Sequence, residues 1–90
     1  MDEERLNKIK ASLDHVHDWP SIYIFKFIVL THSSKLGVLT ELFSKEAEMS
    51  TRLSKNAKYT SITIKELISS SDEVLLKYRE VHAIGDVIAL

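Results

Sequence analysis

The chain contains no cysteine, only two glycines and a single proline among its 90 residues. The absence of cysteine excludes disulfide bonds, a thiol nucleophile and a zinc site built on cysteine ligands. The longest apolar run is Phe27–Leu30, which is far shorter than the roughly 20 residues needed to span a bilayer. The acidic start Met-Asp-Glu-Glu differs from the basic start of a signal peptide. By exclusion, we expect a protein of the bacterial cytoplasm.

The chain also lacks a strong excess of either charge. Its formal net charge of −1 and its pI near 6.4 argue against a dedicated DNA-binding protein, which usually carries a strongly basic face. Neither glycine flanks a serine as in a Gly-x-Ser-x-Gly elbow, and no Gly-x-x-x-x-Gly-Lys-Ser phosphate loop occurs. We therefore predict a protein that is not an enzyme, with no catalytic residues and no cofactor.

The remaining pattern predicts alternating helices and strands. Apolar residues recur at helical spacing in residues 3–16, and β-branched and aromatic residues dominate 21–31. Ser70 and Glu73 have the spacing of a helix N-terminal capping box. The predicted elements are a helix at 3–16, a strand at 21–31, a helix at 34–46, strands at 48–54 and 58–68, a helix from the Ser70 cap to 83, and a last strand at 86–90.

This order predicts an α+β fold in a single domain. Without the first helix it is β-α-β-β-α-β, the ferredoxin-like pattern. We expect a four-stranded antiparallel sheet with two helices on one face, in which the first and third strands are central. Residues 1–18 form a helical extension, and residues 19–90 form the ferredoxin-like core.

Several short motifs resemble a known family. They are Trp19-Pro20 before the first strand, Phe25-Lys26 within it, the hairpin Ser54–Ser61, and Val87–Leu90 at the end. Together they resemble, over residues 18–90, the small bacterial family of unknown function typified by YbeD. The resemblance implies a ferredoxin-like fold similar in shape to ACT regulatory domains. It implies no enzyme activity, cofactor or established site.

His15 and His17, flanked by acidic residues, superficially suggest a metal site. Residues two apart on a helix point in divergent directions, so a shared metal would need an extended backbone there. We interpret these residues as a solvated helix end and predict no metal.

The junction between the first strand and the next helix is a candidate ligand site. Ser33 and Ser34 lie where free backbone N–H groups at a helix start can hold an anion, and Gly37 would let a ligand approach the backbone. The Gly37–Leu39 run also resembles the ACT pattern, although the acidic residue and proline often found before that glycine are absent. The alternative is a serine cap followed by a tolerated glycine.

A basic hairpin suggests a second candidate surface. It combines lysines and an arginine with one outward aromatic, Tyr59, and faintly suggests binding of single-stranded RNA. The alternative is a hairpin kept soluble by its charges, since lysine also discourages pairing of edge strands. The residues of this predicted interaction surface are Lys26, Arg52, Ser54, Lys58, Tyr59 and Ser61.

The first strand carries apolar residues on both of its faces, which predicts a cover for each. Its outward side chains are Ile22, Ile24, Ile28 and Leu30, and burying each is worth about 1.5–3 kcal/mol. The cover could be the helix 3–16, which we favour, or another subunit, in a homodimer formed through a sheet edge or face.

The sequence thus predicts a small regulatory module that binds a partner protein or a small metabolite in an ACT-like manner. The alternative is a single-stranded RNA-binding protein that uses the outward sheet face and the basic hairpin. We regard nucleic acid as the less favoured partner and expect no membrane association.

Overall fold

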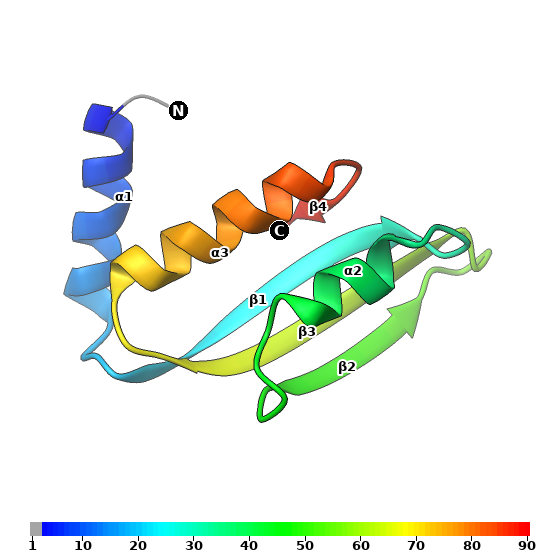
Figure 1. The fold of residues 1–90 in the computed structure, drawn as a ribbon, viewed down its shortest axis with the longest axis horizontal. Helices are drawn as coiled ribbons and strands as arrows, with labels where there is room; N and C mark the ends of the chain where they lie inside the picture. Colours follow the sequence, from blue (N-terminus) through cyan, green and yellow to red (C-terminus); the bar gives the residue numbers. More distant parts are fainter. Residues whose placement is uncertain (1–2) are drawn as a thin grey trace.

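The computed structural model describes residues 3–90. Residues 1 and 2, which the predicted helical extension includes, lie outside the described residues. Seven elements follow one another in the predicted order (Figure 1). They are α1 (Glu3–Val16), β1 (Ser21–Leu30), α2 (Lys35–Glu41), β2 (Glu48–Leu53), β3 (Tyr59–Ile68), α3 (Ser71–Ile84) and β4 (Ile88–Ala89).

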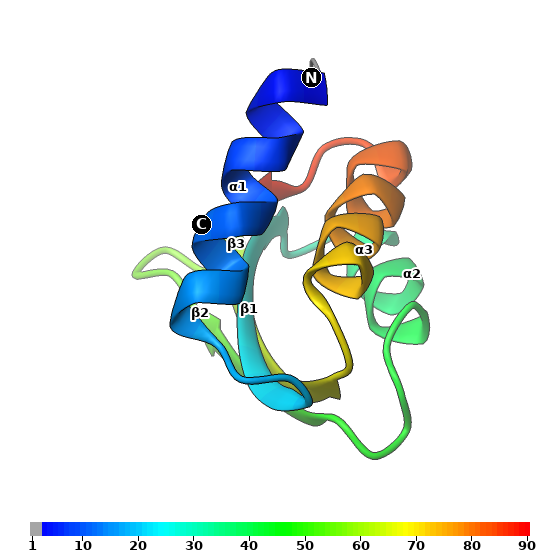
Figure 2. The same cartoon turned by 90° about the vertical axis from the view of Figure 1, so that its left-hand side faces the viewer.

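The strands form one antiparallel sheet in the order β2-β3-β1-β4. β1 pairs with β3 along its whole length, from Ser21 opposite Ile68 to Leu30 opposite Tyr59. Helices α2 and α3 lie on the same side of the sheet (Figure 2). The prediction of a ferredoxin-like α+β fold with central first and third strands is therefore confirmed.

The core lies between the sheet and these two helices. Alternating residues of β1 and β3 are buried there, together with Leu39, Val74 and Val81 from the helices and Phe43 from the segment after α2. Aromatic rings join the layers, since the ring centroids of Phe25 and Phe43 are 5.1 Å apart. Such pairs add stability beyond the burial of apolar area. The alternation of apolar residues in the sequence therefore determines which face of the sheet is inward.

The predicted hairpin between β2 and β3 turns at Asn56 and Ala57. Ser54 N–H donates to the Tyr59 carbonyl at 2.8 Å, and Asn56 Oδ1 accepts from the Lys58 N–H at 3.1 Å. Ala57 has a φ of 59°, in the left-handed region that a residue with a Cβ rarely occupies. The turn thus contains a backbone conformation that glycine would adopt at lower cost.

The start of α3 follows the capping-box signal in the sequence. The Ser70 hydroxyl accepts from the Glu73 N–H at 3.3 Å, and Glu73 Oε2 accepts from the Ser69 N–H at 3.0 Å. The first bond satisfies one of the donors that a helix N-terminus leaves free, and the second bonds the residue before the cap to the helix. Gly85, with a φ of 79°, ends the helix.

The second helix is shorter than predicted, since it ends at Glu41 and not near residue 46. The N–H groups of Leu42 and Phe43 bond to carbonyls three residues back, at 3.2 and 3.3 Å. The N–H of Ser44 instead donates to Glu66 Oε1 in β3 at 2.7 Å. This tertiary hydrogen bond therefore replaces the backbone bond that Ser44 would make if α2 continued. The last strand is also shorter than predicted and comprises only Ile88–Ala89.

The first helix does not cover the outward face of the sheet, so that prediction is wrong. It lies beside the start of α3 (Figures 1 and 2), and its contacts with other elements are chiefly with α3. Leu13 packs against the core, whereas Val16 remains exposed. Leu6 and Leu13 of the α1 stripe therefore lie towards α3 and the core, and not over the outward residues of β1.

Candidate functional site

The outward sheet face is the side of the sheet opposite α2 and α3. It carries the even-numbered residues of β1 and β2 and the odd-numbered residues of β3, which share a side because paired residues in an antiparallel sheet project together. The face consists of Ile22, Ile24, Lys26, Ile28, Leu30, Glu48, Ser50, Arg52, Tyr59, Ser61, Thr63, Lys65, Leu67 and Ile88.

One end of this face is an exposed apolar patch, which we call the Ile24 patch: Ile22, Ile24 and Leu67. Ile22 lies directly opposite Leu67 in the β1–β3 ladder. The three side chains are 55%, 53% and 61% exposed, respectively. Single exposed apolar residues are normal, but a contiguous group on the two central strands is typical of a contact surface.

The other end of the face is an open depression beside the hairpin, which we call the hairpin hollow. Its volume is about 440 Å³, and it is lined by Ile28, Arg52, Leu53, Ser54, Lys55, Tyr59 and Ser61. The Ser61 hydroxyl donates to the Arg52 carbonyl at 3.3 Å, so a bond between β2 and β3 supports its floor. Apolar and cationic side chains therefore lie around one recess.

Four of the six residues of the predicted interaction surface line the hairpin hollow: Arg52, Ser54, Tyr59 and Ser61. Lys26 lies nearer the middle of the outward sheet face, opposite Thr63. Lys58 is placed over the Tyr59 ring, with its Nζ 5.5 Å from the ring centroid. Tyr59 is the one aromatic side chain that the described strands place on this face, since Tyr23, Phe25 and Phe27 face the helices.

The predicted ligand junction is tightly bonded. The Ser33 hydroxyl donates to the Leu30 carbonyl at 2.8 Å and accepts from the Lys35 N–H at 3.3 Å. Ser34 precedes α2 without a side-chain cap bond, and a Cβ added at Gly37 would meet no atom within 4 Å. The ligand site at Ser33, Ser34 and Gly37 stays a prediction.

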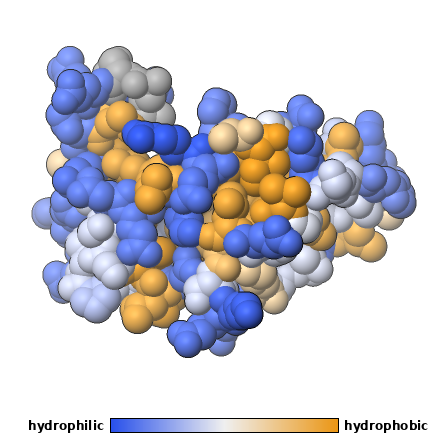
Figure 3. All heavy atoms as spheres, viewed as in Figure 1, coloured by the Kyte–Doolittle hydropathy of each residue, from blue (hydrophilic) through white to orange (hydrophobic). Residues whose placement is uncertain are grey.

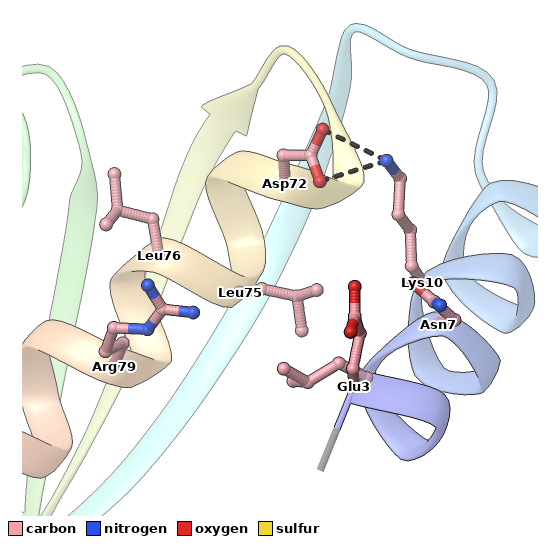
Figure 4. A pocket seen from close by; sticks show the side chains of 8 residues that line it. Glu3, Asn7, Lys10, Asp72, Leu75, Leu76 and Arg79 are labelled. Atoms are coloured by element: carbon pink, nitrogen blue, oxygen red, sulfur yellow. Dashed lines mark hydrogen bonds and ion pairs between the residues drawn. The ribbon is translucent and has the colours of Figure 1, made fainter. Parts of the chain in front are cut away.

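A second depression, of about 370 Å³, lies between α1 and α3. Figure 3 shows the surface hollowed between these helices. Lys10 Nζ is 3.0 Å from one oxygen of Asp72 and 3.1 Å from the other, and Leu75 projects from α3 towards α1 (Figure 4). The side chains of Lys10 and Asp72 are 41% and 71% exposed, so this ion pair contributes little stability.

Two buried polar features were missed by the sequence reasoning. Glu66 faces the core and is 8% exposed; its Oε1 accepts from Ser44, and its Oε2 is buried without a described partner. The hydroxyls of Tyr23 and Tyr78 are hydrogen-bonded at 3.2 Å, and burial, followed by this bond, raises the pKa of Tyr78. The alternation in β3 could have predicted the burial of Glu66, because Glu66 is on the same side of the strand as Ile62 and Ile64.

The two histidines near the end of α1 do not form a metal site with their neighbours. Within residues 3–90, no three histidine or acidic side chains are grouped so that they could hold a metal ion. His17 Nδ1 is 3.2 Å from the Ser21 hydroxyl, and its ring stacks on Trp19 with centroids 5.0 Å apart. Trp19 Nε1–H in turn donates to Asp14 at 2.9 Å. This group therefore joins α1 to the start of β1.

No described helix is both long and apolar enough to cross a membrane. The geometry thus defines the class of the protein: a small ferredoxin-like α+β module with an added N-terminal helix and an accessible outward sheet face.

Residues 14–90 match the family described as "Protein of unknown function (DUF493)", and the chain belongs to this family. The resemblance to the YbeD-type family is therefore confirmed. The fold is similar to the solution structure of protein HP0495 from H. pylori, with a TM-score of 0.66 and 22% sequence identity. The similarity covers 82% of this chain and 85% of that one. No curated protein sequence matches the chain.

Proposed function

We propose that this protein is a non-enzymatic cytoplasmic module with a regulatory role, and that it binds a partner protein through its outward sheet face. The observation that carries the proposal is the Ile24 patch, in which Ile22 and Ile24 of one central strand adjoin Leu67 of the other. The predicted cover, α1, lies elsewhere. A partner that buries these side chains gains about 1.5–3 kcal/mol for each one fully buried.

The hairpin hollow supports the same face as a binding surface. Ile28 and Tyr59 provide apolar contact area there, while Arg52 and Lys55 provide positive charge. An acidic residue of the partner, or the carboxylate or phosphate of a small metabolite, would complement these cations. In this proposal the Ile24 patch supplies most of the affinity, and the hollow orients the partner by charge.

The RNA-binding alternative has less support from the geometry. Single-stranded RNA modules of this topology stack bases on two or three aromatic side chains of the central strands. Here the described outward strands offer Tyr59, and the Lys58 ammonium lies over its ring. RNA binding would also weaken steeply as salt rises, because phosphate contacts release counterions.

Affinity capture from a bacterial extract tests the proposal with three forms of the full chain. Ile24→Lys places a charge in the Ile24 patch, and Leu76→Lys is the matched control on α3, because Leu76 is 50% exposed and Ile24 is 53% exposed. We expect the wild type and Leu76→Lys to retain a common protein that Ile24→Lys loses. If Ile24→Lys retains every species that the wild type captures, the outward sheet face is not the binding surface.

A further inference from the structure

The edge strand β2 is the feature that carries a further inference, independent of the proposed outward-face partner. β2 is one border of the sheet, and all six of its residues are exposed. Its ladder with β3 runs without a break from Glu48 opposite Lys65 to Leu53 opposite Thr60. The other side of β2 therefore presents unpaired backbone groups to any additional strand.

The direction of these free backbone groups follows from the hairpin. Ser54 N–H points to β3, because it donates to the Tyr59 carbonyl at 2.8 Å. Backbone groups alternate along an antiparallel strand, so Ser50 and Arg52 also direct theirs towards β3. Met49, Thr51 and Leu53 consequently direct their N–H and C=O groups towards the free edge.

Natural proteins usually protect such an edge with proline, a bulge or charges that repel a second strand. β2 contains no proline and no glycine, and its only charged residues are Glu48 and Arg52, which have opposite signs. They lie at equal distances from Ser50 and project from the same side of the strand. If β2 pairs antiparallel with its own copy about Ser50, each Glu48 therefore faces an Arg52, and the opposed charges attract.

We propose that two copies of this chain associate through antiparallel pairing of their β2 edges, with Ser50 opposite Ser50 of the second copy. In this register Glu48 lies opposite Arg52 of the second copy, and Arg52 lies opposite its Glu48. Met49 and Thr51 of the two copies exchange the backbone hydrogen bonds, which agrees with the direction of their free groups. The charged pairs occupy non-hydrogen-bonded positions, where opposed side chains are closest.

The same register covers the apolar residues at this border. Met49 and Leu53 project to the helix side of the sheet yet remain exposed. In the paired edge, Met49 lies opposite Thr51 of the second copy, and Leu53 lies opposite its Ala47. A short edge contact of this kind gives a weak dimer. It joins the two sheets into one continuous sheet, with the outward faces of both copies on the same side.

Two charge variants of the full chain test the register. Glu48→Lys makes all the facing charges positive, and Arg52→Glu makes them all negative, so each variant alone repels its own copy. An equimolar mixture of the two forms opposite-charge pairs at every facing position. Glu41→Lys on α2 and Lys8→Glu on α1 are exposed controls with the same changes in net charge. The double variant Glu48→Lys/Arg52→Glu exchanges the charges and preserves the pairing.

Sedimentation equilibrium from about 10 μM to about 1 mM measures association over the range expected of weak dimers. The wild type, both controls and the double variant should dimerise, and each single edge variant should associate at least about tenfold more weakly. The mixture should recover dimers, and native mass spectrometry should identify them as heterodimers. A monomeric wild type at the highest concentration, unchanged dimers in the single variants, or no heterodimer in the mixture would overturn the proposal.

Discussion

The Ser44 N–H donates a hydrogen bond of 2.7 Å to Oε1 of Glu66, and this bond joins the segment after α2 to the buried face of β3. The residues are 22 positions apart in the sequence. The carboxylate of Glu66 lies on the core side of the sheet, where its second oxygen has no described partner. A buried acceptor thus fixes where α2 ends, at the cost of an incompletely satisfied polar group.

Replacement of Glu66 tests this role. We expect Glu66→Ala to lower the free energy of unfolding by about 1–3 kcal/mol, because Ser44 loses its acceptor and the core loses side-chain volume. Glu66→Gln keeps an acceptor oxygen and should cost less than the alanine variant. Urea denaturation of both variants measures the difference. Equal stability of wild type and Glu66→Ala would show that the bond contributes nothing to the fold.

The hydrogen bond between Tyr23 and Tyr78 leads to a prediction about high pH. Burial raises the pKa of Tyr78 in the folded chain, so the unfolded chain loses this proton more readily above about pH 10. The stability associated with the neutral phenol is therefore present below pH 10 and falls as pH rises further. Tyr78→Phe should reduce this fall, and should cost about 0.5–1.5 kcal/mol at neutral pH.

Denaturant unfolding at a series of pH values measures both effects of Tyr78→Phe. Tyr59→Phe is the control, because Tyr59 is an exposed residue of the hairpin, where such a change alters stability by less than about 0.5 kcal/mol. If Tyr78→Phe and the wild type lose stability equally between pH 9 and pH 11, ionisation of Tyr78 is not coupled to folding.

The bond from Trp19 to Asp14 leads to a prediction about low pH. This bond, with the Ser71 hydroxyl and the nearby Lys10 charge, holds the pKa of Asp14 below its usual value. The interaction is therefore present above about pH 4 and is lost as pH falls through the lowered pKa. Trp19 is the only tryptophan, so its fluorescence reports this change directly. Asp14→Ala should remove the acid transition, and Asp18→Ala should retain it; the same transition in both variants would contradict the assignment.

The left-handed Ala57 predicts a stabilising substitution. Ala57→Gly should raise the free energy of unfolding by about 0.5–1 kcal/mol, because glycine removes the Cβ strain at a φ of 59° and the relief exceeds the added unfolded-state entropy. Ala83→Gly makes the same chemical change within α3 and should lower stability by about 0.5–1 kcal/mol. Thermal unfolding compares the two. A loss of stability in both variants would indicate that the turn is not strained.

Local sequence signals predicted the elements whose causes are local. Residues 58–68 were predicted as a strand, and the spacing of Ser70 and Glu73 marked the start of α3. The end of α2 could not be predicted in this way, because it depends on a hydrogen bond to Glu66 in another element. The error over α1 has a similar origin: an amphipathic stripe shows that a helix is covered, but not which surface covers it.

The candidate site was predictable only in part. The parity of β1 identified Ile22 and Ile24 as outward residues, and the structure adds Leu67 beside them. The hairpin hollow could not be predicted without knowing which residues of the three strands share a side. It brings Ile28 of β1 together with Arg52 of β2 and Tyr59 of β3. Pairing register, which depends on contacts between distant segments, was the missing information.

Site-specific photo-crosslinking in living bacteria tests most directly whether the outward sheet face is a binding surface. A photoreactive residue is placed at Ile24 in one form of the chain and at Leu76, which is similarly exposed on α3, in another. We predict that position 24 gives a discrete crosslinked protein species and that position 76 does not. Crosslinks to the same species at position 76, with none at position 24, would contradict the account.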